Sequence, residues 1–354
     1  MRILQINSER GWRGGERQTL LTALGLRERG HEVALLVRAG GALEERAQAQ
    51  GLRTHAVKTT AQFGAWLARY ARPYDVLHVQ TANVLAWALL AKPMHRRPVI
   101  FSRRTSFPVK GFSGFSRLKW ACTDVRVAIS AAAASAMREM GLSVQVIPSA
   151  VPAVTPNPSR VQEFIARENL RGYRLAGTAA ALSPEKDPVT LIHAAAQVCA
   201  KHPDVVFVHW GAEGAAADAA RQAIQDLGLG DRYRLLGFES GVEQLYPALA
   251  VFVMASRHEA LGSSVLDAMV QSVPVVATQA GGLKELLAEG RGLLSAPGDS
   301  SDLARHIGEV LSEPELGRAL AERSLQEVQN RYGVEAMVQA YESLYRQATA
   351  ATTK

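Results

Sequence analysis

The sequence predicts an α/β protein built from two doubly wound parallel-sheet domains. The chain has 354 residues, which is more than a single typical core organises. Short apolar runs alternate with helical stretches in two successive series, and this alternation is typical of parallel sheets flanked by helices. Between the two series, the segment VIPSAVPAVTPNP carries four prolines, which predicts a linker. We therefore expect one domain over residues 1–152 and a second over 153–332.

The first series alternates β-rich runs with helical patterns. The runs that read as strands are Ile3–Ile6, Glu32–Val37, Val76–Val79, Val99–Ser102, Arg126–Ile129 and Val144–Ile147. The clearest helical stretches between them are Glu16–Glu28, Gly41–Ala49 and Ala131–Glu139.

The second series repeats the alternation. Its predicted strands are Leu175–Ala179, Val205–Trp210, Tyr233–Leu236, Val251–Met254, Val273–Ala277 and Gly292–Leu294. Its predicted helices are Pro188–Ala200, Ala215–Asp226, Gly241–Leu249, Val265–Val270, Leu283–Glu289 and Ser301–Leu311, and an amphipathic helix over Val334–Arg346 follows. Two such domains are expected to form a crevice at the carboxyl ends of their strands.

The composition limits the compartments and the classes of partner that suit this protein. A net charge of +7 favours anionic partners such as nucleotide diphosphates, acidic glycans, anionic lipids or nucleic acid. The sequence has only two cysteines, which argues against a fold held together by disulfides and favours the reducing cytoplasm. The start MRILQI turns polar at once, and no apolar run reaches the length of a membrane span. We expect a cytoplasmic protein that, if it contacts a membrane, binds at the membrane surface.

The segment SRHEALGSSVLDA, residues 256–268, carries the strongest chemical signal. Glu259 and Asp267 lie eight residues apart, and the turn Leu261-Gly262-Ser263-Ser264 between them leads into a helical pattern. Such a turn presents free N–H groups and the positive end of a helix dipole, so it can hold a phosphate. The two acids can grip hydroxyl groups on either side of that phosphate. The segment therefore predicts a site for a nucleotide sugar.

This segment resembles the acid-x7-acid motif of the retaining glycosyltransferases of family 4, which have the GT-B fold of two Rossmann-like domains. Three further segments resemble that family in the same order, MRILQINSERGWRGGERQTL, ALSPEKDPVTLIHAA and PVVATQAGGLKELL. The resemblance implies that Glu259 binds the donor sugar and that Asp267, where the family usually has Glu, binds the ribose. It also implies that a C-terminal helix at about 333–354 packs on the N-terminal domain.

The resemblance assigns two phosphate-facing elements. Gly14 and Gly15 match the family's glycine-rich loop, although a plain strand–helix turn would use the same residues. Lys186 matches the lysine that neutralises the departing diphosphate. The family's companion arginine falls on Ala181, so another basic residue must replace it, or the diphosphate depends more on Lys186 and the helix N-terminus.

Arg104, with Arg103 beside it, stands where family members often have a histidine near the reacting sugar. An arginine is no base at neutral pH, but it can clamp a phosphate or an acidic sugar. The change leaves open a phosphate clamp, an anionic acceptor or a plain basic pair on the surface.

The segment KGFSGFSRLKW, residues 110–120, mixes Lys110, Arg117 and Lys119 with aromatic side chains in a predicted loop. Together with Arg103, these residues suit an acceptor or an anionic membrane surface. Core packing of the aromatics and binding of single-stranded nucleic acid are the alternatives. Gly237 and Phe238 resemble the family's base-reading position, and Gly281-Gly282 would pack closely under the phosphate turn.

The sequence thus predicts a retaining, metal-independent glycosyltransferase that uses a UDP- or GDP-linked sugar and no cofactor. The expected acceptor is a glycan or glycolipid in lipopolysaccharide or other cell-envelope polysaccharide synthesis, and no nucleic acid partner is expected. Glu259, Lys186 and Arg104 are the predicted catalytic residues. Two alternatives remain, a nucleotide-sugar epimerase of the same fold and a non-catalytic module that binds anionic membrane or glycan.

Overall fold

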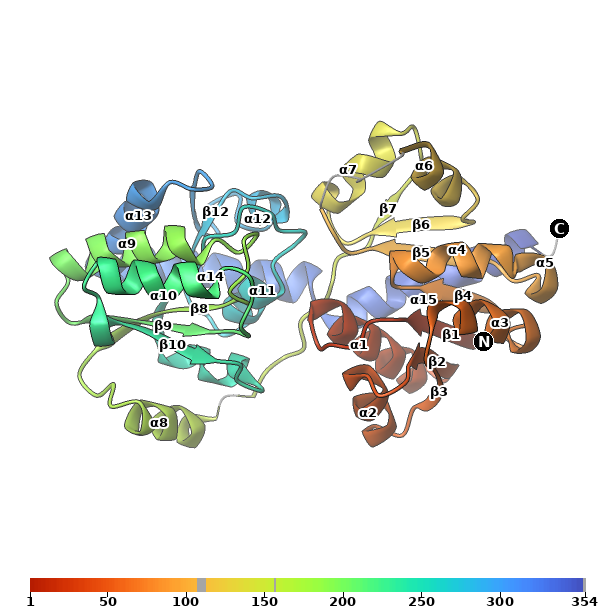
Figure 1. Cartoon of the computed structure of the whole chain (residues 1–354), viewed down its shortest axis with the longest axis horizontal. Coiled ribbons are helices and arrows are strands. Elements are labelled where there is room, and N and C mark those ends of the chain that lie inside the picture. Colours follow the sequence, from red (N-terminus) through yellow and green to blue (C-terminus); the bar gives the residue numbers. More distant parts are fainter. Residues whose placement is uncertain (107–112, 156, 353–354) are drawn as a thin grey trace. The chain divides into compact units, whose positions relative to one another are not determined.

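The computed structural model describes residues 1–106, 113–155 and 157–352, and the chain forms two compact units (Figure 1). Unit 1 comprises Met1–Ala150 with Tyr332–Lys354, and unit 2 comprises Val151–Arg331. The boundary after Ala150 lies inside the proline-rich segment. Each unit holds one parallel sheet covered by helices, so the predicted fold class is confirmed.

Unit 1 contains a seven-stranded parallel sheet in the order β3-β2-β1-β4-β5-β6-β7. Its strands are β1 (Arg2–Asn7), β2 (Glu32–Arg38), β3 (Arg53–Val57), β4 (Val76–Val79), β5 (Val99–Arg103), β6 (Val125–Ala128) and β7 (Gln145–Val146). The strand order reverses between β1 and β4. The loops that follow these two strands leave the sheet on opposite sides, which creates space for side chains at the carboxyl edge.

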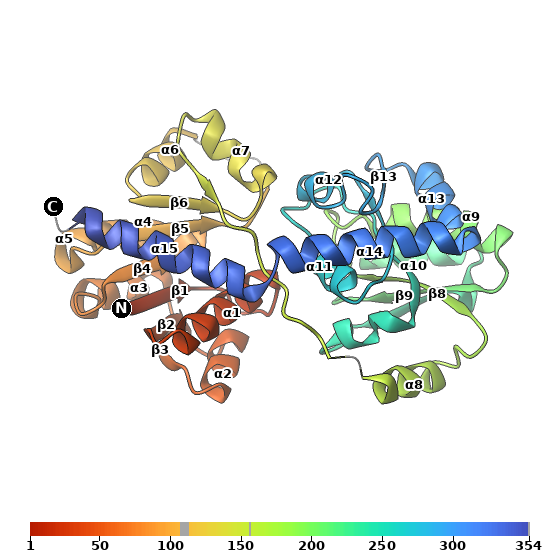
Figure 2. The ribbon, with the colours of Figure 1, turned by 180° about the vertical axis from the view of Figure 1, so that it is seen from behind.

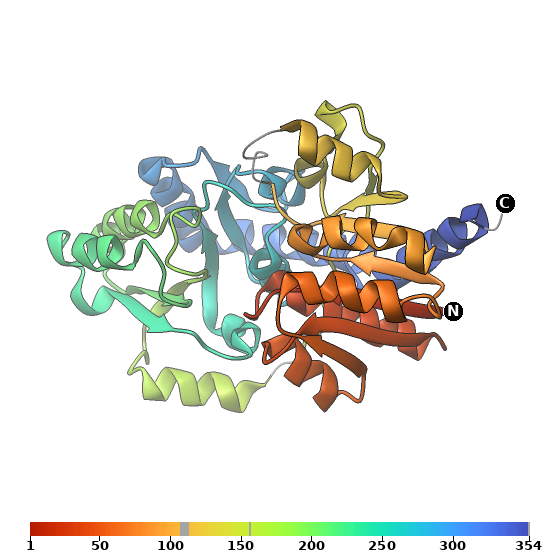
Figure 3. The same cartoon turned by 45° about the vertical axis from the view of Figure 1, so that its right-hand side comes forward.

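Helices cover both faces of this sheet because successive strand residues point to opposite sides. Ile3 packs with α1 (Gly14–Glu28), α2 (Ala42–Ala49) and α15 (Val334–Thr352), and Figure 2 shows α15 running along that face. Leu4 packs on the other face with α3 (Thr60–Tyr70) and α4 (Ala82–Leu90), seen in orange over the sheet in Figure 3. The remaining helices of the unit are α5 (Lys92–His95), α6 (Ser113–Ala121) and α7 (Ala131–Glu139).

An ionic cluster fixes the terminal helix α15 to unit 1. The Glu342 carboxylate accepts from Arg29 Nε at 2.6 Å and lies 3.2 Å from His31 Nε2. Arg346, one turn further along α15, donates to the same carboxylate at 2.7 Å. Hydrogen bonds from Arg346 and Arg29 lower the pKa of Glu342 to about 2. The C-terminal segment therefore belongs to the core of unit 1, although it follows unit 2 in the sequence.

Unit 2 contains a six-stranded parallel sheet in the order β10-β9-β8-β11-β12-β13. Its strands are β8 (Arg174–Ala179), β9 (Val205–Trp210), β10 (Tyr233–Gly237), β11 (Leu249–Met254), β12 (Val275–Thr278) and β13 (Leu293–Ser295). The order reverses between β8 and β11, so the loops after these two strands flank the switch point of the sheet.

One face of the unit 2 sheet packs on α9 (Pro188–Lys201), α10 (Ala217–Asp226) and α13 (Ser300–Ser312) in a single apolar cluster (Figure 1). The aromatic rings of Phe164, Trp210, Tyr246 and Phe252 follow one another at centroid distances of 5.1–6.2 Å in a second cluster. This second cluster joins α8 (Pro158–Arg167) and the 3₁₀ helix η2 (Val242–Ala248) to strands β9 and β11. The other helical segments are η1 (Gly230–Arg232), α11 (Ser263–Val270), α12 (Gly282–Leu286) and α14 (Pro314–Arg331).

Two predicted elements differ from the structure. The α-helix predicted at Gly241–Leu249 is the 3₁₀ helix η2, and Pro247 inside it lacks the N–H that an α-helix needs. The loop predicted around residues 110–120 is helical from Ser113 onward, as α6. There Trp120 is buried among residues of α4 and the sheet, so tertiary packing stabilises a helix that the mixed pattern of charges and aromatics did not indicate.

Candidate functional site

Two loops of unit 2 meet at the switch point of its sheet and bring opposite charges together. Lys186 lies in the loop after β8, and Glu259 lies in the loop after β11. The Lys186 ammonium donates to Glu259 Oε2, and the two side chains are 25% and 13% exposed. Both groups are therefore partly shielded from water yet open to a ligand. The structure brings together these two predicted site residues, which are 73 positions apart in the chain.

Arg257, which was not among the predicted site residues, holds the same two loops together. Its backbone N–H donates to Glu185 O at 2.9 Å, and its Nε donates to Asp187 Oδ2 at 2.7 Å. Asp187 has a φ of +47° and caps α9 through Thr190. The Arg257 side chain is 58% exposed. A second cation thus lies on the loops that carry Lys186, although Ala181 stands at the expected arginine position. Its place two residues before Glu259 is the signal that could have identified it.

The predicted phosphate turn begins a helix at Gly262. Gly262 has a φ of +100° and precedes α11, so no side chain caps the first N–H groups of that helix. Ser263 and Ser264 form its first turn and are half-buried. Leu261 is buried, which leaves its backbone as the part that can face a ligand, and Asp267 is also buried, at 5% exposure.

Gly281 and Gly282 lie directly under the loop that carries Glu259. A Cβ atom on Gly281 would stand 2.0 Å from the carbonyl oxygen of Glu259, and one on Gly282 would stand 2.2 Å from that of Ala260. The N–H of Gly282 donates to Glu259 O at 2.9 Å. The two glycines therefore let the two backbones approach closely and fix the position of Glu259.

His209 supports the loop that carries Lys186. Its Nε2 lies 2.9 Å from Ala180 O, which can only accept, so Nε2 carries the proton. Its Nδ1 then accepts from the hydroxyl of Tyr233 at 2.8 Å. Burial lowers the pKa of His209 to about 4, and the neutral ring that this arrangement needs is the form present at neutral pH. Gly211 packs against the same carbonyl, which a Cβ there would approach to 1.8 Å.

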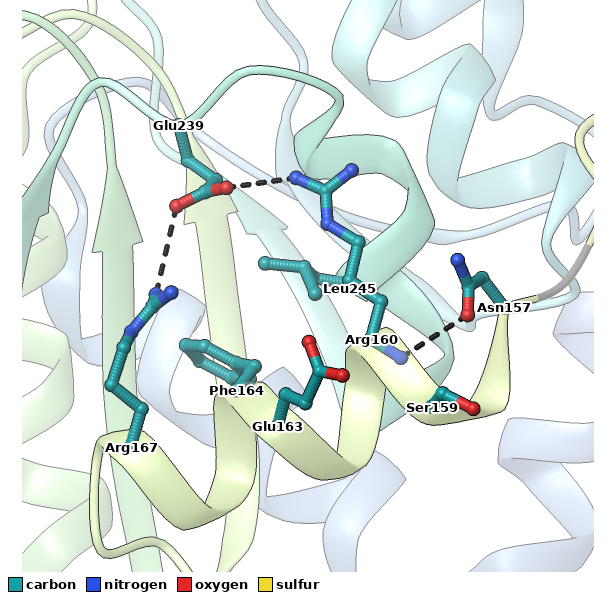
Figure 4. A pocket seen from close by; sticks show the side chains of 8 residues that line it. All are labelled: Asn157, Ser159, Arg160, Glu163, Phe164, Arg167, Glu239 and Leu245. Carbon is teal, nitrogen blue, oxygen red and sulfur yellow. Dashed lines mark hydrogen bonds and ion pairs between the residues drawn. The ribbon is translucent and has the colours of Figure 1, made fainter.

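Arg160 holds the segment that follows β10, where Gly237 and Phe238 lie. It pairs with Glu239 at 2.8 Å, donates to Gln244 Oε1 at 3.0 Å, and donates to the carbonyl of Ser240. Gly237 has a φ of +70°, and the Phe238 ring is 63% exposed. Figure 4 shows Arg160 and Arg167 reaching toward Glu239 from α8, beside a cavity of about 270 Å³ with Phe164 in its wall.

Replacing Arg160 with alanine is expected to loosen residues 239–244. Three hydrogen bonds are lost, each worth about 1 kcal/mol, so amide hydrogen exchange in this segment should accelerate on the order of 100-fold. Arg167→Ala is the matched control, because Arg167 comes from the same helix and, among the described residues, its contact with residues 239–244 is a single ion pair with Glu239 at 3.6 Å. Equal exchange rates in the two variants would contradict the role given to Arg160.

In unit 1, the glycine-rich turn follows β1 and opens α1. Gly14 and Gly15 are the first residues of that helix. Glu16 closes the turn by accepting from the N–H of Arg13 at 3.0 Å and from Asn7 Nδ2 at 3.3 Å. Burial raises the pKa of Glu16. Glu16 is thus a structural part of the turn.

Arg104 follows β5 at the same carboxyl edge of the sheet. Its Nε and Nη2 donate to Gln80 Oε1 at 2.9 and 2.8 Å, and its Nη1 donates to Ser149 Oγ at 3.2 Å. Its Cδ lies 3.7 Å from the place that a Cβ on Gly15 would take. Arg104 and the glycine-rich turn are therefore neighbours, and Arg104 is half-buried rather than a surface residue. No sequence motif marks Gln80 or Ser149 as partners of this arginine.

Arg103 corrects a prediction. It was expected to contact an acceptor or a membrane, but it is 5% exposed and donates to Ala133 O at 2.7 Å. Its guanidinium lies over the Trp120 ring, 5.5 Å from the centroid. Successive strand residues alternate between faces, so Arg103 points into the helical layer while Arg104, beyond the strand, does not.

The other basic residues predicted to contact an acceptor or a membrane are Lys110, Arg117 and Lys119. Arg117 donates to Met140 O at 3.2 Å and Lys119 to Ala82 O at 3.3 Å, both from α6. Lys110 lies outside the described residues. Between these two cations Leu118 is exposed, as is Phe115 nearby on α6.

Within residues 1–106, 113–155 and 157–352, no three His, Cys, Asp or Glu side chains gather closely enough to hold a metal ion. None of the helices in these ranges is long and apolar enough to cross a membrane.

Comparison with known proteins gives two family matches that together cover most of the chain. Residues 12–155 match the model of glycosyltransferase family 4, and residues 161–327 match that of glycosyl transferases group 1.

Relatives and solved structures agree with these matches. The lipopolysaccharide core biosynthesis glycosyltransferase LpsE of Rhizobium meliloti is 31% identical over 42% of this chain and 44% of its own length. The lipopolysaccharide core biosynthesis mannosyltransferase LpcC of Rhizobium leguminosarum is 27% identical over 80% of this chain and 81% of its own. The crystal structure of Anabaena HepE with UDP and glucose superposes with a TM-score of 0.89 at 23% identity, over 98% of this chain and 100% of that one.

Proposed function

Because this chain belongs to glycosyltransferase family 4 and has the GT-B fold, we propose that it transfers a sugar from a nucleotide diphosphate sugar to a glycan acceptor. The single observation that carries this proposal is the meeting of Lys186 and Glu259 at the switch point of unit 2, next to the turn at Gly262. A cation, a carboxylate and an uncapped helix N-terminus suit a diphosphate linked to a hydroxyl-rich sugar.

The proposed donor site assigns a role to each group. Glu259 accepts hydrogen bonds from the donor sugar, and Asp267 accepts them from the ribose. The Lys186 ammonium and the N–H groups of Gly262, Ser263 and Ser264 stabilise the negative charge on the departing diphosphate. Gly237 and Phe238 contact the base. UDP is the nucleotide we propose first, since HepE, of the same fold, was crystallised with UDP and glucose.

We further propose that transfer proceeds with retention and without a metal ion. The positive charge of Lys186, with Arg257 beside it, would do the neutralising work that a divalent cation does in other transferases. The acceptor we propose is a glycan of the cell envelope, such as a lipopolysaccharide core, because LpsE and LpcC carry that description. The net charge of +7 suits a phosphorylated or acidic glycan.

The experiment is a thermal-shift series on the wild-type chain with UDP, GDP, ADP and CMP and their common sugar conjugates. A nucleotide present at 100 times its dissociation constant stabilises the folded state by about 2.7 kcal/mol, so one diphosphate series should stand out. Conversion of the best sugar nucleotide is then followed with and without EDTA. Loss of turnover with EDTA would contradict the metal-independent mechanism.

Two outcomes of this series favour the alternatives. A well-folded chain that no nucleotide stabilises would favour a non-catalytic module that binds anionic membrane or glycan. Release of a free epimer from the sugar nucleotide, without any acceptor, would favour a nucleotide-sugar epimerase.

We also propose contact with an anionic membrane surface through α6. The exposed side chains of Phe115 and Leu118, at 60% and 62%, flank the basic Arg117 on this helix, an arrangement that suits the lipid headgroup region. The chain is expected to co-sediment with vesicles that contain phosphatidylglycerol and not with neutral vesicles. Phe115→Ser with Leu118→Ser should weaken this binding at least about threefold, since each substitution removes exposed apolar area that the membrane would bury. Unchanged binding of the double variant would contradict the role of α6.

A further inference from the structure

We propose that Arg104 binds an anionic group of the acceptor, a phosphate or a carboxylate, and that a chain of buried polar side chains running to the terminal helix α15 orients its guanidinium for this ligand. The inference rests on the proposed function, because the ligand is the acceptor of that transferase.

The hydrogen-bond partners of Arg104 among the described residues are all neutral. A guanidinium stays protonated and offers five N–H groups, of which the Nε, one Nη1 and one Nη2 hydrogen bond to neutral oxygens of Gln80 and Ser149. Among the residues that the structure describes, no carboxylate forms an ion pair with it, and residues 107–112, 156 and 353–354 contain neither Asp nor Glu. A half-buried charge with polar partners but no counter-ion is a site that an anion can complete.

Two glutamine side chains orient Arg104, and in each of them the amide oxygen accepts a hydrogen bond while the amide nitrogen donates one. Gln80 Oε1 accepts from Arg104, so the amide nitrogen of Gln80 faces the other way and donates to Gln5 Oε1 at 2.8 Å. The amide nitrogen of Gln5 then donates to the hydroxyl oxygen of Tyr345, on α15, at 3.0 Å. A flip of either amide would set donor against donor. The Tyr345 hydroxyl supports this arrangement through two residues, Gln5 and His78, and His78 Nδ1 lies 3.1 Å from the amide nitrogen of Gln80.

The series of hydrogen bonds continues past Tyr345, with each residue donating to the next. The Tyr345 hydroxyl donates to His78 Nδ1 at 2.6 Å, and His78 Nε2 lies 2.7 Å from Ser102 Oγ. The Ser102 hydroxyl lies 3.1 Å from that of Tyr341, also on α15. His78 is fully buried, and burial with the nearby charge of Arg104 lowers its pKa, so the ring is neutral and accepts at Nδ1 as the chain requires.

The acceptor, rather than the donor, is the source that we assign to the anion. Lys186 and the turn at Gly262, which are proposed to neutralise the departing diphosphate, lie in unit 2, where they already supply a cation and free N–H groups. The turn at Gly14 and Gly15 in unit 1 is predicted to face the donor phosphate through its backbone, so the donor has its cation without Arg104. Arg104 belongs to unit 1 and adjoins the turn at Gly15. A phosphorylated sugar and a uronic acid present the same chemistry to a guanidinium, namely paired anionic oxygens.

The test measures binding of glucose 6-phosphate, glucuronate and glucose to the full chain by calorimetry, with and without saturating UDP. The wild type is expected to bind at least one of the two acidic sugars about tenfold or more tightly than glucose, and which one binds identifies the anion. Arg104→Gln should abolish this preference, and UDP binding is measured in the same titrations. Arg104→Lys, which keeps the charge but loses the planar fork, should retain part of the preference.

Tyr345→Phe tests the positioning chain. It should reduce the preference for the acidic sugar about three- to tenfold, because Gln5 and His78, which both contact the amide nitrogen of Gln80, each lose a hydrogen-bond partner. Tyr341→Phe is the matched control, since it removes a hydroxyl from the same helix at the far end of the chain, and it should leave the preference unchanged. The ratio of acidic to neutral sugar binding is read in folded protein, so a general loss of stability does not imitate the effect.

Three results would overturn the proposal. Equal binding of acidic and neutral sugars by the wild type would mean that no anion site exists. An Arg104→Gln variant that loses affinity for UDP but keeps the preference would make Arg104 a donor clamp. Equal effects of Tyr345→Phe and Tyr341→Phe would show that the series of hydrogen bonds from Tyr345 does not position Arg104. Failure of the wild type to bind UDP would instead overturn the proposed donor, and it is read separately in the same titrations.

Discussion

Lys186→Ala is expected to remove nucleotide-induced stabilisation and to lower the rate of transfer about 100- to 1,000-fold. The proposed transition state places most of its negative charge on the departing diphosphate, and removing one preorganised donor from such a site has an effect of this size. The fold itself should survive the change, because both side chains of the Lys186–Glu259 pair keep some contact with water, at 25% and 13% exposure, and the Glu259 carboxylate left behind can be solvated. The measurements are thermal shift with UDP and initial rates of transfer.

Two controls separate the site from general charge effects. Lys201→Ala removes an exposed lysine of the same charge at the end of α9, and it should leave nucleotide binding unchanged. Lys186→Arg keeps the charge and should retain part of the activity. If Lys186→Ala binds UDP as tightly as the wild type does, the diphosphate does not contact this lysine, and the proposed donor site is wrong.

Gly281→Ala is expected to lower the stability of the chain by about 3 kcal/mol or more and to abolish donor binding. Gly281 has a φ of +51° and a ψ of −120°, a conformation that side chains rarely adopt. Its new methyl group would also stand 2.0 Å from the carbonyl oxygen of Glu259. The backbone under Glu259 must therefore move. Chemical denaturation gives the free energy of unfolding, and calorimetry gives the affinity for the donor.

Gly228→Ala separates the clash from the backbone conformation. Gly228 has a φ of +59°, and nothing lies within 4 Å of a Cβ built there. This variant should lose only about 1 kcal/mol, the usual cost of a left-handed conformation for alanine, and should keep full affinity for the donor. Similar losses in the two variants would mean that the contact with Glu259 has no special effect.

The fold could be predicted because both sheets are parallel and buried on both faces. Their strands are short apolar runs between helical patterns, so β1, β2, β4, β5 and the strands of unit 2 have clear local signals. The edge strand β3 is Arg53–Val57, a polar run at the border of the sheet, and no local pattern marks it. Helix α6 also lacks a clear pattern, because packing of Trp120 stabilises it.

The sequence by itself determined the family and the two-sheet architecture, and it marked the segments of the proposed donor site, since these depend on local patterns and motif spacing. It placed Lys186 and Glu259 on separate loops, and the reversal of strand order between β8 and β11 decided that they form an ion pair. Tertiary structure alone decided which of two adjacent arginines stays available. Arg103 is within β5 and points into a packed layer, whereas Arg104 lies beyond the strand and bonds to Gln80. The hydrogen bonds that orient Arg104 join residues up to 340 positions apart, a relation that only the folded chain creates.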